Sequence, residues 1–340
     1  MTHVSQVRLQ LIGVSLTQHL ADAEKCFCNW SSMKIAVIGA GRKRNGIGAY
    51  SARFANVEGA HIVAVLAQEL AIARHDAAGL KEYGITAEAY GDMETLIDRH
   101  RPDAFIIASP AATHADYCVR AVAAGMHVLC EKPFIWDNGF DSRLATRILD
   151  SAREQGLIVA MNSQWPFVLP IYDQLCGLPP AAQIESFHIQ LAPLSRGRNM
   201  IPDSMPHALS ILYTVLGPGS LEQMELKPAS DRLQVSFTYV TMHGRCRVTA
   251  NLVHETRQPR SFAFGFNGSI AERIIDMETY RIAFTWGDQR CEADDPLQLC
   301  VRDFLHACSG DVSPQIGRAH IVDTMEMLQQ VYTAWPLDRS

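Results

Sequence analysis

A glycine-rich loop is the first stretch of the chain whose residue types and spacing suggest chemistry. The apolar run from Lys34 to Ile38 leads into the sequence GAGRKRNGIG at 39–48, and apolar side chains at helical spacing follow. Glycines let a backbone turn tightly and approach a phosphate, and the first turn of a helix offers unpaired N–H groups. The pattern predicts a site for a dinucleotide diphosphate. The expected contacts from this segment are Gly39, Gly41, Arg42, Arg44, Asn45, Gly46 and Ile47.

The spacing of this loop leaves an alternative open. The usual fingerprint is G-x-G-x-x-G, whereas here the third glycine comes about three residues late. A plain tight turn between a strand and a helix would also use Gly39 and Gly41. We follow the nucleotide interpretation because the loop stands between a buried strand and a helix.

Charged side chains in the loop bear on which dinucleotide would bind. An acid at the end of the second strand would bind the ribose 2′-hydroxyl of NAD, but Ala67 stands there and Glu69 comes two residues later. Arg42, Lys43 and Arg44 lie in the loop, and guanidinium groups suit a 2′-phosphate. We therefore expect NADP, with NAD as the alternative if these cations only form a solvated surface run.

Apolar patterning predicts the elements that would position this loop. Short apolar runs alternate with helical stretches over 34–161, which indicates repeated βαβ units and a parallel sheet. Asp92 and Thr113 are expected to cap the starts of two helices, and Gly125 and Gly156 to end two others. Beyond about residue 165, strand-like runs follow one another through short turns, which indicates an antiparallel sheet with helices on one face.

Together these patterns predict an α/β fold in two domains. A Rossmann domain, doubly wound around a parallel sheet, is expected over 33–162. An α+β domain with a largely antiparallel open sheet is expected over 163–340, for substrate binding and oligomerisation. Residues 1–32 are expected to be a poorly ordered N-terminal extension, because Met33 directly precedes the first strand.

Composition excludes several classes of function. The 340 residues are 48% hydrophobic and 19% charged with a net charge of −6, and they contain no basic block suited to nucleic acid. No apolar run reaches the length of a membrane helix. The nine cysteines follow neither a disulfide nor a zinc spacing. We expect a cytoplasmic protein with reduced thiols, no metal, no nucleic-acid partner and no membrane partner.

Two further motifs carry a resemblance to a known family. Ser109-Pro110-Ala111-Ala112-Thr113-His114 follows the fourth expected strand, and Glu131-Lys132-Pro133 follows the fifth. With the glycine loop, these motifs resemble the Gfo/Idh/MocA oxidoreductases, the glucose-fructose oxidoreductase and inositol dehydrogenase family. The resemblance covers about residues 33–335, including Asp303-Phe304-Leu305, which is similar to that family's closing segment.

The resemblance implies roles for residues in the first domain. Ser109, Pro110 and Glu131 would contact the nicotinamide ribose, and His114 would belong to the same cofactor site. Lys132 would stand beside C4 of the nicotinamide, also as a cofactor contact. There its ammonium would hydrogen-bond the reacting oxygen and help to pass a proton as the hydride moves.

In the second domain, Asp203 and His207 resemble the family's Asp-x-x-x-His motif. Positions i and i+4 share one helix face, so both side chains can point into one cleft. The resemblance makes His207 the proton acceptor in oxidation or the donor in reduction, and Asp203 a group that orients the substrate or the histidine. The expected catalytic residues are Lys132, His207 and Asp203. The structural alternative makes Asp203 a simple N-cap and His207 a half-buried helix residue.

The chain departs from the family pattern around this motif. Residues 198–202 precede Asp203 where the family usually carries glycines, and the segment Asn162-Ser163-Gln164-Trp165 stands where an Arg or Tyr is frequent. These departures leave the substrate open. Arg196 and Arg198 could meet an anionic group of the substrate, or they could form a solvated loop.

The activity implied is hydride transfer between NAD(P) and a hydroxyl or carbonyl carbon of a small polar, possibly sugar-like, substrate, in a homodimer or homotetramer. Two alternatives remain. One is a non-catalytic NAD(P)-binding regulator of the same fold, and the other is a reductase of a C=N or C=C bond. The presence of both Lys132 and His207 favours the enzyme over the regulator.

Overall fold

The computed structural model describes residues 33–41, 46–310 and 312–336 of the chain. The expectation for residues 1–32 therefore lies outside the described residues, as do the expected contacts of Arg42, Lys43, Arg44 and Asn45.

Six parallel strands form the first sheet, in the order β3-β2-β1-β4-β5-β6. Their bounds are β1 Lys34–Ile38, β2 His61–Leu66, β3 Glu88–Tyr90, β4 Ala104–Ile107, β5 His127–Glu131 and β6 Val159–Asn162. The strand order reverses between β1 and β4, which is where doubly wound folds open a ligand crevice at the carboxyl ends of the strands. The predicted Rossmann sheet is confirmed.

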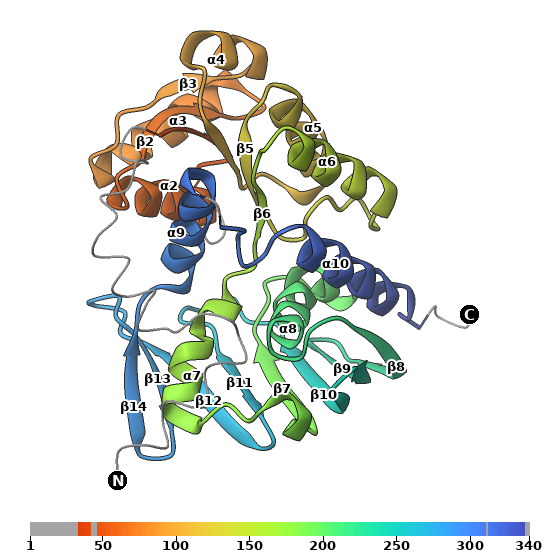
Figure 1. Cartoon of the computed structure of the whole chain (residues 1–340). Helices are drawn as coiled ribbons and strands as arrows, with labels where there is room; N and C mark the ends of the chain where they lie inside the picture. Colours follow the sequence, from red (N-terminus) through yellow and green to blue (C-terminus); the bar gives the residue numbers. More distant parts are fainter. Residues whose placement is uncertain (1–32, 42–45, 311, 337–340) are drawn as a thin grey trace.

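Helices cover both faces of this sheet (Figure 1). Their bounds are α2 Ile47–Val57, α3 Leu70–Leu80, α4 Met93–His100, α5 His114–Ala123 and α6 Ser142–Glu154. The side chains of α2 and α3 pack into one hydrophobic cluster, and those of α4, α5 and α6 pack into the other. Residues on the strands are buried on both sides, which explains their near-continuous apolar runs.

One predicted helix cap is confirmed and another is wrong. The carboxylate of Asp92 accepts a hydrogen bond from the backbone N–H of Thr95, 2.8 Å away, and so caps α4. Thr113 makes no such bond to α5, because a short 3₁₀ turn, Ala111–Thr113, already gives it helical backbone angles. Its hydroxyl instead donates to the carbonyl of Pro110.

Eight strands form the second sheet, in the order β14-β13-β12-β11-β7-β10-β9-β8. Their bounds are β7 Ser186–Leu191, β8 Gly219–Pro228, β9 Arg232–Thr241, β10 Gly244–Val253, β11 Phe262–Phe266, β12 Ser269–Ile275, β13 Ile282–Trp286 and β14 Gln289–Ala293. All neighbours are antiparallel except β7 and β10, which run parallel. Helices α7 (Leu169–Cys176) and α8 (Met200–Leu216) lie on one face of this sheet (Figure 1). The predicted α+β architecture is confirmed.

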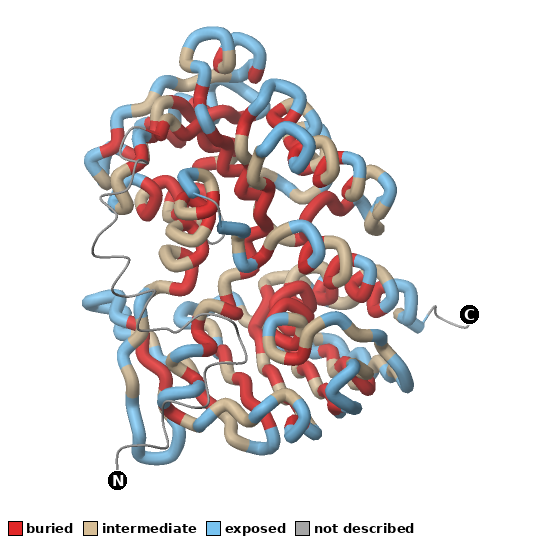
Figure 2. Tube along the Cα trace, in the orientation of Figure 1, coloured by how far each residue is buried: buried red, intermediate tan, exposed pale blue. Residues whose placement is uncertain are grey.

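The last two helices tie the two sheets together. Helix α9 (Pro296–Ser309) buries Leu297, Phe304 and Leu305 in the same cluster as the side chains of α2, so the chain returns to the first sheet after the second. Helix α10 (Arg318–Thr333) packs against both α8 and α6. Figure 2 shows buried segments in the first sheet and again along α8. The division at 162/163 stays a prediction.

Within the ranges that the structure describes, no helix combines the length and the hydrophobicity that crossing a bilayer requires.

Candidate functional site

Two glycines of the loop are required by close backbone approaches. Gly39, at φ +82°, would place a Cβ 2.9 Å from the carbonyl oxygen of Ala108 at the end of β4. A Cβ on Gly48 would lie 2.2 Å from the carbonyl oxygen of Gly39. Gly48 therefore lets α2 approach β1, the role that the third glycine of the usual fingerprint fills. Gly48 was not among the expected contacts, although the late third glycine was visible in the spacing of the loop.

The start of α2 is open to an anion. Gly46 caps this helix in the left-handed region, at φ 64°, and supplies no side-chain cap to the first turn. A helix start of this kind offers N–H donors and a positive dipole end to a phosphate. These residues fit a dinucleotide diphosphate.

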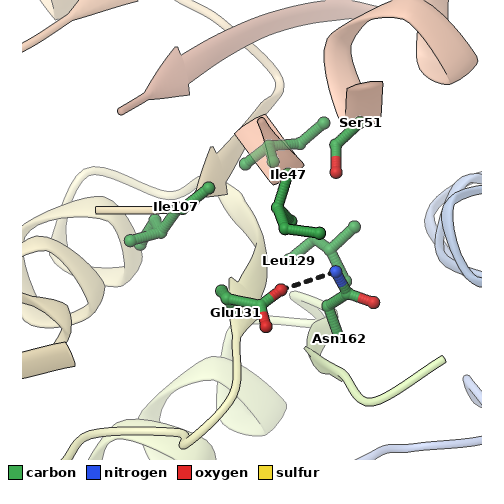
Figure 3. Close-up of a pocket in the computed structure, with 8 residues that line it drawn as sticks. Ile47, Ser51, Ile107, Leu129, Glu131 and Asn162 are labelled. Carbon is green, nitrogen blue, oxygen red and sulfur yellow. Dashed lines mark hydrogen bonds between the residues drawn. The ribbon is translucent and has the colours of Figure 1, made fainter. Parts of the chain in front are cut away.

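A carboxylate lies at the floor of the crevice, where β5 ends. Asn162, at the end of β6, donates from Nδ2 to Oε2 of Glu131 over 2.7 Å, and Figure 3 shows the two side chains pointing toward each other below Ile47. Burial raises the pKa of Glu131 to about 7, while the charge of Lys132 and the bond from Asn162 partly oppose that rise. Oδ1 of Asn162 is buried and has no partner among the described residues. It is therefore placed to accept a bond from a ligand.

His114 braces the two loops that bound this crevice. Its Nε2 lies 2.8 Å from the carbonyl oxygen of Ser109, and its Nδ1 lies 3.1 Å from that of Pro133. The hydroxyl of Ser109 is bonded to that of Thr113 at 2.7 Å. His114 thus holds the loop after β4 against the loop after β5. The direct contacts of Ser109, Pro110 and His114 with a cofactor stay a prediction.

Lys132 and Asp203 meet across the junction of the two sheets. Nζ of Lys132 donates to the backbone carbonyl of Asp203 and lies 3.3 Å from its Oδ1. Ser195 donates its hydroxyl to the other carboxylate oxygen over 2.7 Å. Burial would raise the pKa of Asp203, but the charge of Lys132 and the bonds from Ser195 outweigh it and bring the pKa to about 2. Asp203 is therefore ionised at neutral pH and holds the ammonium in place.

His207 lies on the same helix, one turn beyond Asp203. Its Nδ1 is bonded to the hydroxyl of Ser163 at 3.2 Å, and its ring meets the ring of Trp165 edge-on. Burial lowers the pKa of His207 well below its usual value, the positive charge of Lys132 lowers it further, and Asp203 opposes the shift. The imidazole is therefore neutral at pH 7. Its Nε2 has no hydrogen-bond partner among the residues described, which leaves it for a ligand.

The structural alternative for Asp203 is wrong. Helix α8 begins at Met200 with Asn199 as its cap residue, so Asp203 lies inside the first turn. There its carboxylate faces Lys132 and Ser195 rather than the N–H groups of the helix.

Four residues around the candidate catalytic set were not predicted. They are Asn162, Ser163, Trp165 and Ser195. Asn162 is the last residue of β6, and Ser163 and Trp165 follow within three residues, at the carboxyl end of the sheet, where ligands bind in such folds. That position, together with the departure from the family pattern there, was the signal that could have found them. Nothing in the sequence pointed to Ser195.

Arg198 has a structural partner that its sequence position did not reveal. Its guanidinium donates twice to the carbonyl oxygen of Tyr332 at the end of α10 and lies 3.7 Å from the centroid of that ring. Arg196 is exposed and donates to the carbonyl of Ser230. Arg198 therefore fastens α10 to the start of α8.

Among the described residues, no group of three or more His, Cys, Asp or Glu side chains is placed to hold a metal ion. The described cysteines are all free thiols, and Cys26 and Cys28 lie outside the described residues.

Comparison with known proteins places the first domain in a family. Residues 33–163 match the Gfo/Idh/MocA family model, described as an oxidoreductase family with an NAD-binding Rossmann fold. The match ends just beyond β6 and so covers the whole first sheet.

Two curated relatives match over part of the chain. The chain is 41% identical over 83 residues to a dTDP-3,4-didehydro-2,6-dideoxy-alpha-D-glucose 3-reductase of Streptomyces violaceoruber, covering 22% of each protein. It is 34% identical over 127 residues to the inositol 2-dehydrogenase of Klebsiella pneumoniae (strain 342), covering 37% of this chain and 34% of the relative. The matched segments thus span between about a fifth and a third of the curated relatives' lengths.

A solved structure shares the fold of both domains. The UDP-N-acetylglucosamine 3-dehydrogenase of Acidithiobacillus ferrooxidans superposes with a TM-score of 0.67, covering 89% of this chain and 97% of that one at 20% identity. The predicted family is confirmed for the first domain. The NAD-binding Rossmann domain, residues 33–163, belongs to the Gfo/Idh/MocA oxidoreductase family.

Proposed function

We propose that the chain is an NAD(P)-dependent dehydrogenase or reductase that acts on a hydroxyl or carbonyl carbon of a small polar substrate. The observation that carries this proposal is the junction at which Lys132 is held by ionised Asp203, with neutral His207 one helical turn beyond Asp203 on α8. The named activities of the relatives, on sugars and an inositol, agree with such a substrate. When bound, the nicotinamide would accept or supply the hydride.

The residues of the first sheet would hold the cofactor. We assign the diphosphate to Gly39, Gly41, Gly46 and Ile47, supported by the open start of α2 and by the backbone approaches that exclude larger residues. Glu131 would bind the nicotinamide ribose, with Asn162 fixing its carboxylate.

The proton would be handled by two residues from opposite sides of the junction. Lys132 would direct its ammonium at the substrate oxygen and stabilise the charge that develops there. His207 would take the proton from a hydroxyl in oxidation, or return it in reduction, through Nε2. Ser163 fixes the orientation of that ring from the Nδ1 side. Asp203 is a positioning group, because its carboxylate holds Lys132.

Replacing His207 with glutamine is expected to lower kcat/KM for alcohol oxidation about 10²-fold, because the amide cannot accept the proton. The pKa of the imidazole lies well below 6.5, so protonation of His207 should not lower the wild-type rate as the pH falls through 6.5. A fall near pH 7 is expected instead from protonation of Glu131, whose pKa is about 7. A pH profile of kcat/KM for both proteins separates the two groups, because His207→Gln keeps the Glu131 step. Full activity in the variant would remove His207 from the mechanism.

We further propose NADP as the cofactor. β2 ends at Leu66, and the next residues, Ala67 and Gln68, carry no acid for the 2′-hydroxyl of NAD. Glu69 comes after them, at the start of α3. Arg42 and Arg44 remain the expected partners of a 2′-phosphate.

NADPH is therefore expected to bind about 10- to 100-fold more tightly than NADH, the range expected for charged hydrogen bonds to a phosphate. In the double variant Arg42→Ala, Arg44→Ala, NADPH affinity should fall to the NADH value while NADH binding is unchanged. Tryptophan fluorescence titrations measure both constants, and Arg147→Ala on the exposed face of α6 is the matched control. A preference for NADH would contradict the assignment.

Assembly as a homodimer or homotetramer stays a prediction. The face of the second sheet that α7 and α8 leave uncovered is the expected interface. It includes a shallow depression lined by side chains of β7, β10 and β12, among them His188, Arg247 and Ile270.

A further inference from the structure

Arg273, on β12, is a charged side chain set among aromatic rings. Its guanidinium carbon lies 5.1 Å from the ring centroid of Trp165 and 5.8 Å from that of Phe262. These two rings stack on each other with centroids 3.7 Å apart. Trp165 also meets the ring of His207, so Arg273 and the candidate catalytic histidine contact the same indole.

Most of the hydrogen-bonding capacity of Arg273 is unused among the described residues. One terminal nitrogen donates to the backbone carbonyl of Arg260, whereas Nε is buried without a partner among the described residues. A guanidinium carries five N–H donors in a rigid fork, so one hydrogen bond to a carbonyl leaves most of these donors without an acceptor. Burial lowers the pKa of Arg273 to about 10, which still leaves it protonated at neutral pH.

The charge of Arg273 also lacks a close counterion. No carboxylate in the described part of the chain lies within ion-pair distance of it. Asp295 attracts it from further away, but that carboxylate accepts the N–H of Leu297 and caps α9. A buried charge without a paired partner is costly, and attraction to aromatic faces offsets only part of that cost.

A second arginine, Arg260, brings its charge to the same place. Arg260 precedes β11 and is partly buried, with one nitrogen donating to the carbonyl of Ala192 over 3.1 Å. Its charge lowers the pKa of His207 and is attracted by Asp203, so it acts within the candidate catalytic junction. It also lowers the pKa of Arg273. The backbone carbonyl of Arg260 accepts the bond from Arg273, so the two arginines lie on adjoining segments next to the candidate catalytic junction.

We propose that Arg273 and Arg260 form a subsite for an anionic group of the substrate, a carboxylate or a phosphoryl group. The rigid fork of a guanidinium matches the paired oxygens of either group. A substrate held there would lie along Trp165 with its reacting carbon toward His207 and Lys132. The assignment rests on the proposed function, because it takes this junction to be the substrate site. In this proposal the anionic group of the substrate contacts Arg273 and Arg260, rather than Arg196 and Arg198 as the sequence suggested.

The test uses two small anions on the full chain saturated with NADPH, so that the diphosphate site is filled. Inorganic phosphate and acetate are each compared with chloride at equal ionic strength by thermal unfolding. A ligand that binds only the folded state raises the unfolding temperature. We expect phosphate, acetate or both to raise it by about 2–4 °C in the wild type. Phosphate alone would identify a phosphoryl group, and acetate alone a carboxylate.

Arg273→Met should abolish this rise, and Arg273→Lys should reduce it because an ammonium lacks the fork. Without ligand, Arg273→Met should unfold at the same or a higher temperature, since it removes an uncompensated buried charge. Arg290→Met, on exposed β14, is the control and should respond as the wild type does. No rise in the wild type, or an equal rise in Arg273→Met, would overturn the proposal. NADPH binding and hydride transfer are measured in separate assays. If the chain fails those assays, the proposed function is rejected, while the unfolding temperatures still show whether Arg273 binds an anion.

Discussion

Lys132→Met is expected to lower kcat by at least about 10³-fold while changing the dissociation constant of the cofactor only a few-fold. Methionine has nearly the length of lysine but no ammonium, so the substrate oxygen loses both a hydrogen-bond donor and a stabilising charge. The glycine loop and the open start of α2 lie apart from this change and keep their geometry. Steady-state kinetics gives kcat, and a fluorescence titration gives the affinity for the cofactor.

The same substitution has a defined effect on its partner. Asp203 loses the charge that most strongly lowers its pKa, so that pKa should rise, while the bonds from Ser195 remain. Lys227→Met is the matched control, because Lys227 lies on exposed β8 and pairs only with Glu225 at the surface. Turnover that survives in Lys132→Met, in a protein that still binds cofactor, would exclude the mechanism.

The second large effect is expected from Gly48→Ala. The new Cβ would lie 2.2 Å from the carbonyl oxygen of Gly39, a backbone atom that cannot rotate away. The start of α2 must therefore move from the end of β1, with a loss of about 1–3 kcal/mol in the free energy of unfolding. Because the diphosphate site is built from these two segments, cofactor affinity should fall about 10- to 100-fold. Chemical denaturation and calorimetric titration measure the two effects.

The glycine at 79 provides the matched control for this substitution. Gly79 lies in α3, and a Cβ there would meet no atom of the described residues within 4 Å. Gly79→Ala should therefore stabilise the protein by up to about 1 kcal/mol through helix propensity and leave cofactor binding unchanged. If Gly48→Ala binds cofactor as well as Gly79→Ala does, the assigned role of the loop is wrong.

Where local signals agree with the tertiary fold, the sequence predicts the elements closely. The strand β2 coincides with a short apolar run, His61–Leu66, of the kind that predicts the parallel sheet, and α4 begins directly after the capping residue Asp92. The strand β14 has no such local signal, because its sequence, Gln-Arg-Cys-Glu-Ala, lacks strand-forming residues and it is held by pairing with β13. The parallel pairing of β7 with β10 likewise depends on topology that no local pattern records.

The residues of the candidate site likewise fall into those with a local sequence signal and those that depend on the tertiary fold. Motifs on single segments predicted Glu131, Lys132, Asp203 and His207, and the structure pairs Lys132 with Asp203, one helical turn before His207 on α8. The residues that were missed act through contacts between distant segments. Ser163 meets His207, and Ser195 meets Asp203, only because β6 ends beside α8. Such partners follow from packing rather than from spacing along the chain.

The central claim is that this chain moves a hydride rather than only binding a nucleotide. NADPH labelled with deuterium at C4, incubated with the protein and a panel of keto acids, sugars and phosphorylated sugars with carbonyl carbons, tests it most directly. We predict at least one product that is heavier by one deuterium, formed by the wild type and at least about 10³-fold more slowly by Lys132→Met. Tight NADPH binding without deuterium transfer to any member of the panel, or to an imine or enone panel, would contradict the claim and favour a non-catalytic regulator. Transfer only to imines or enones would favour the alternative C=N or C=C reductase.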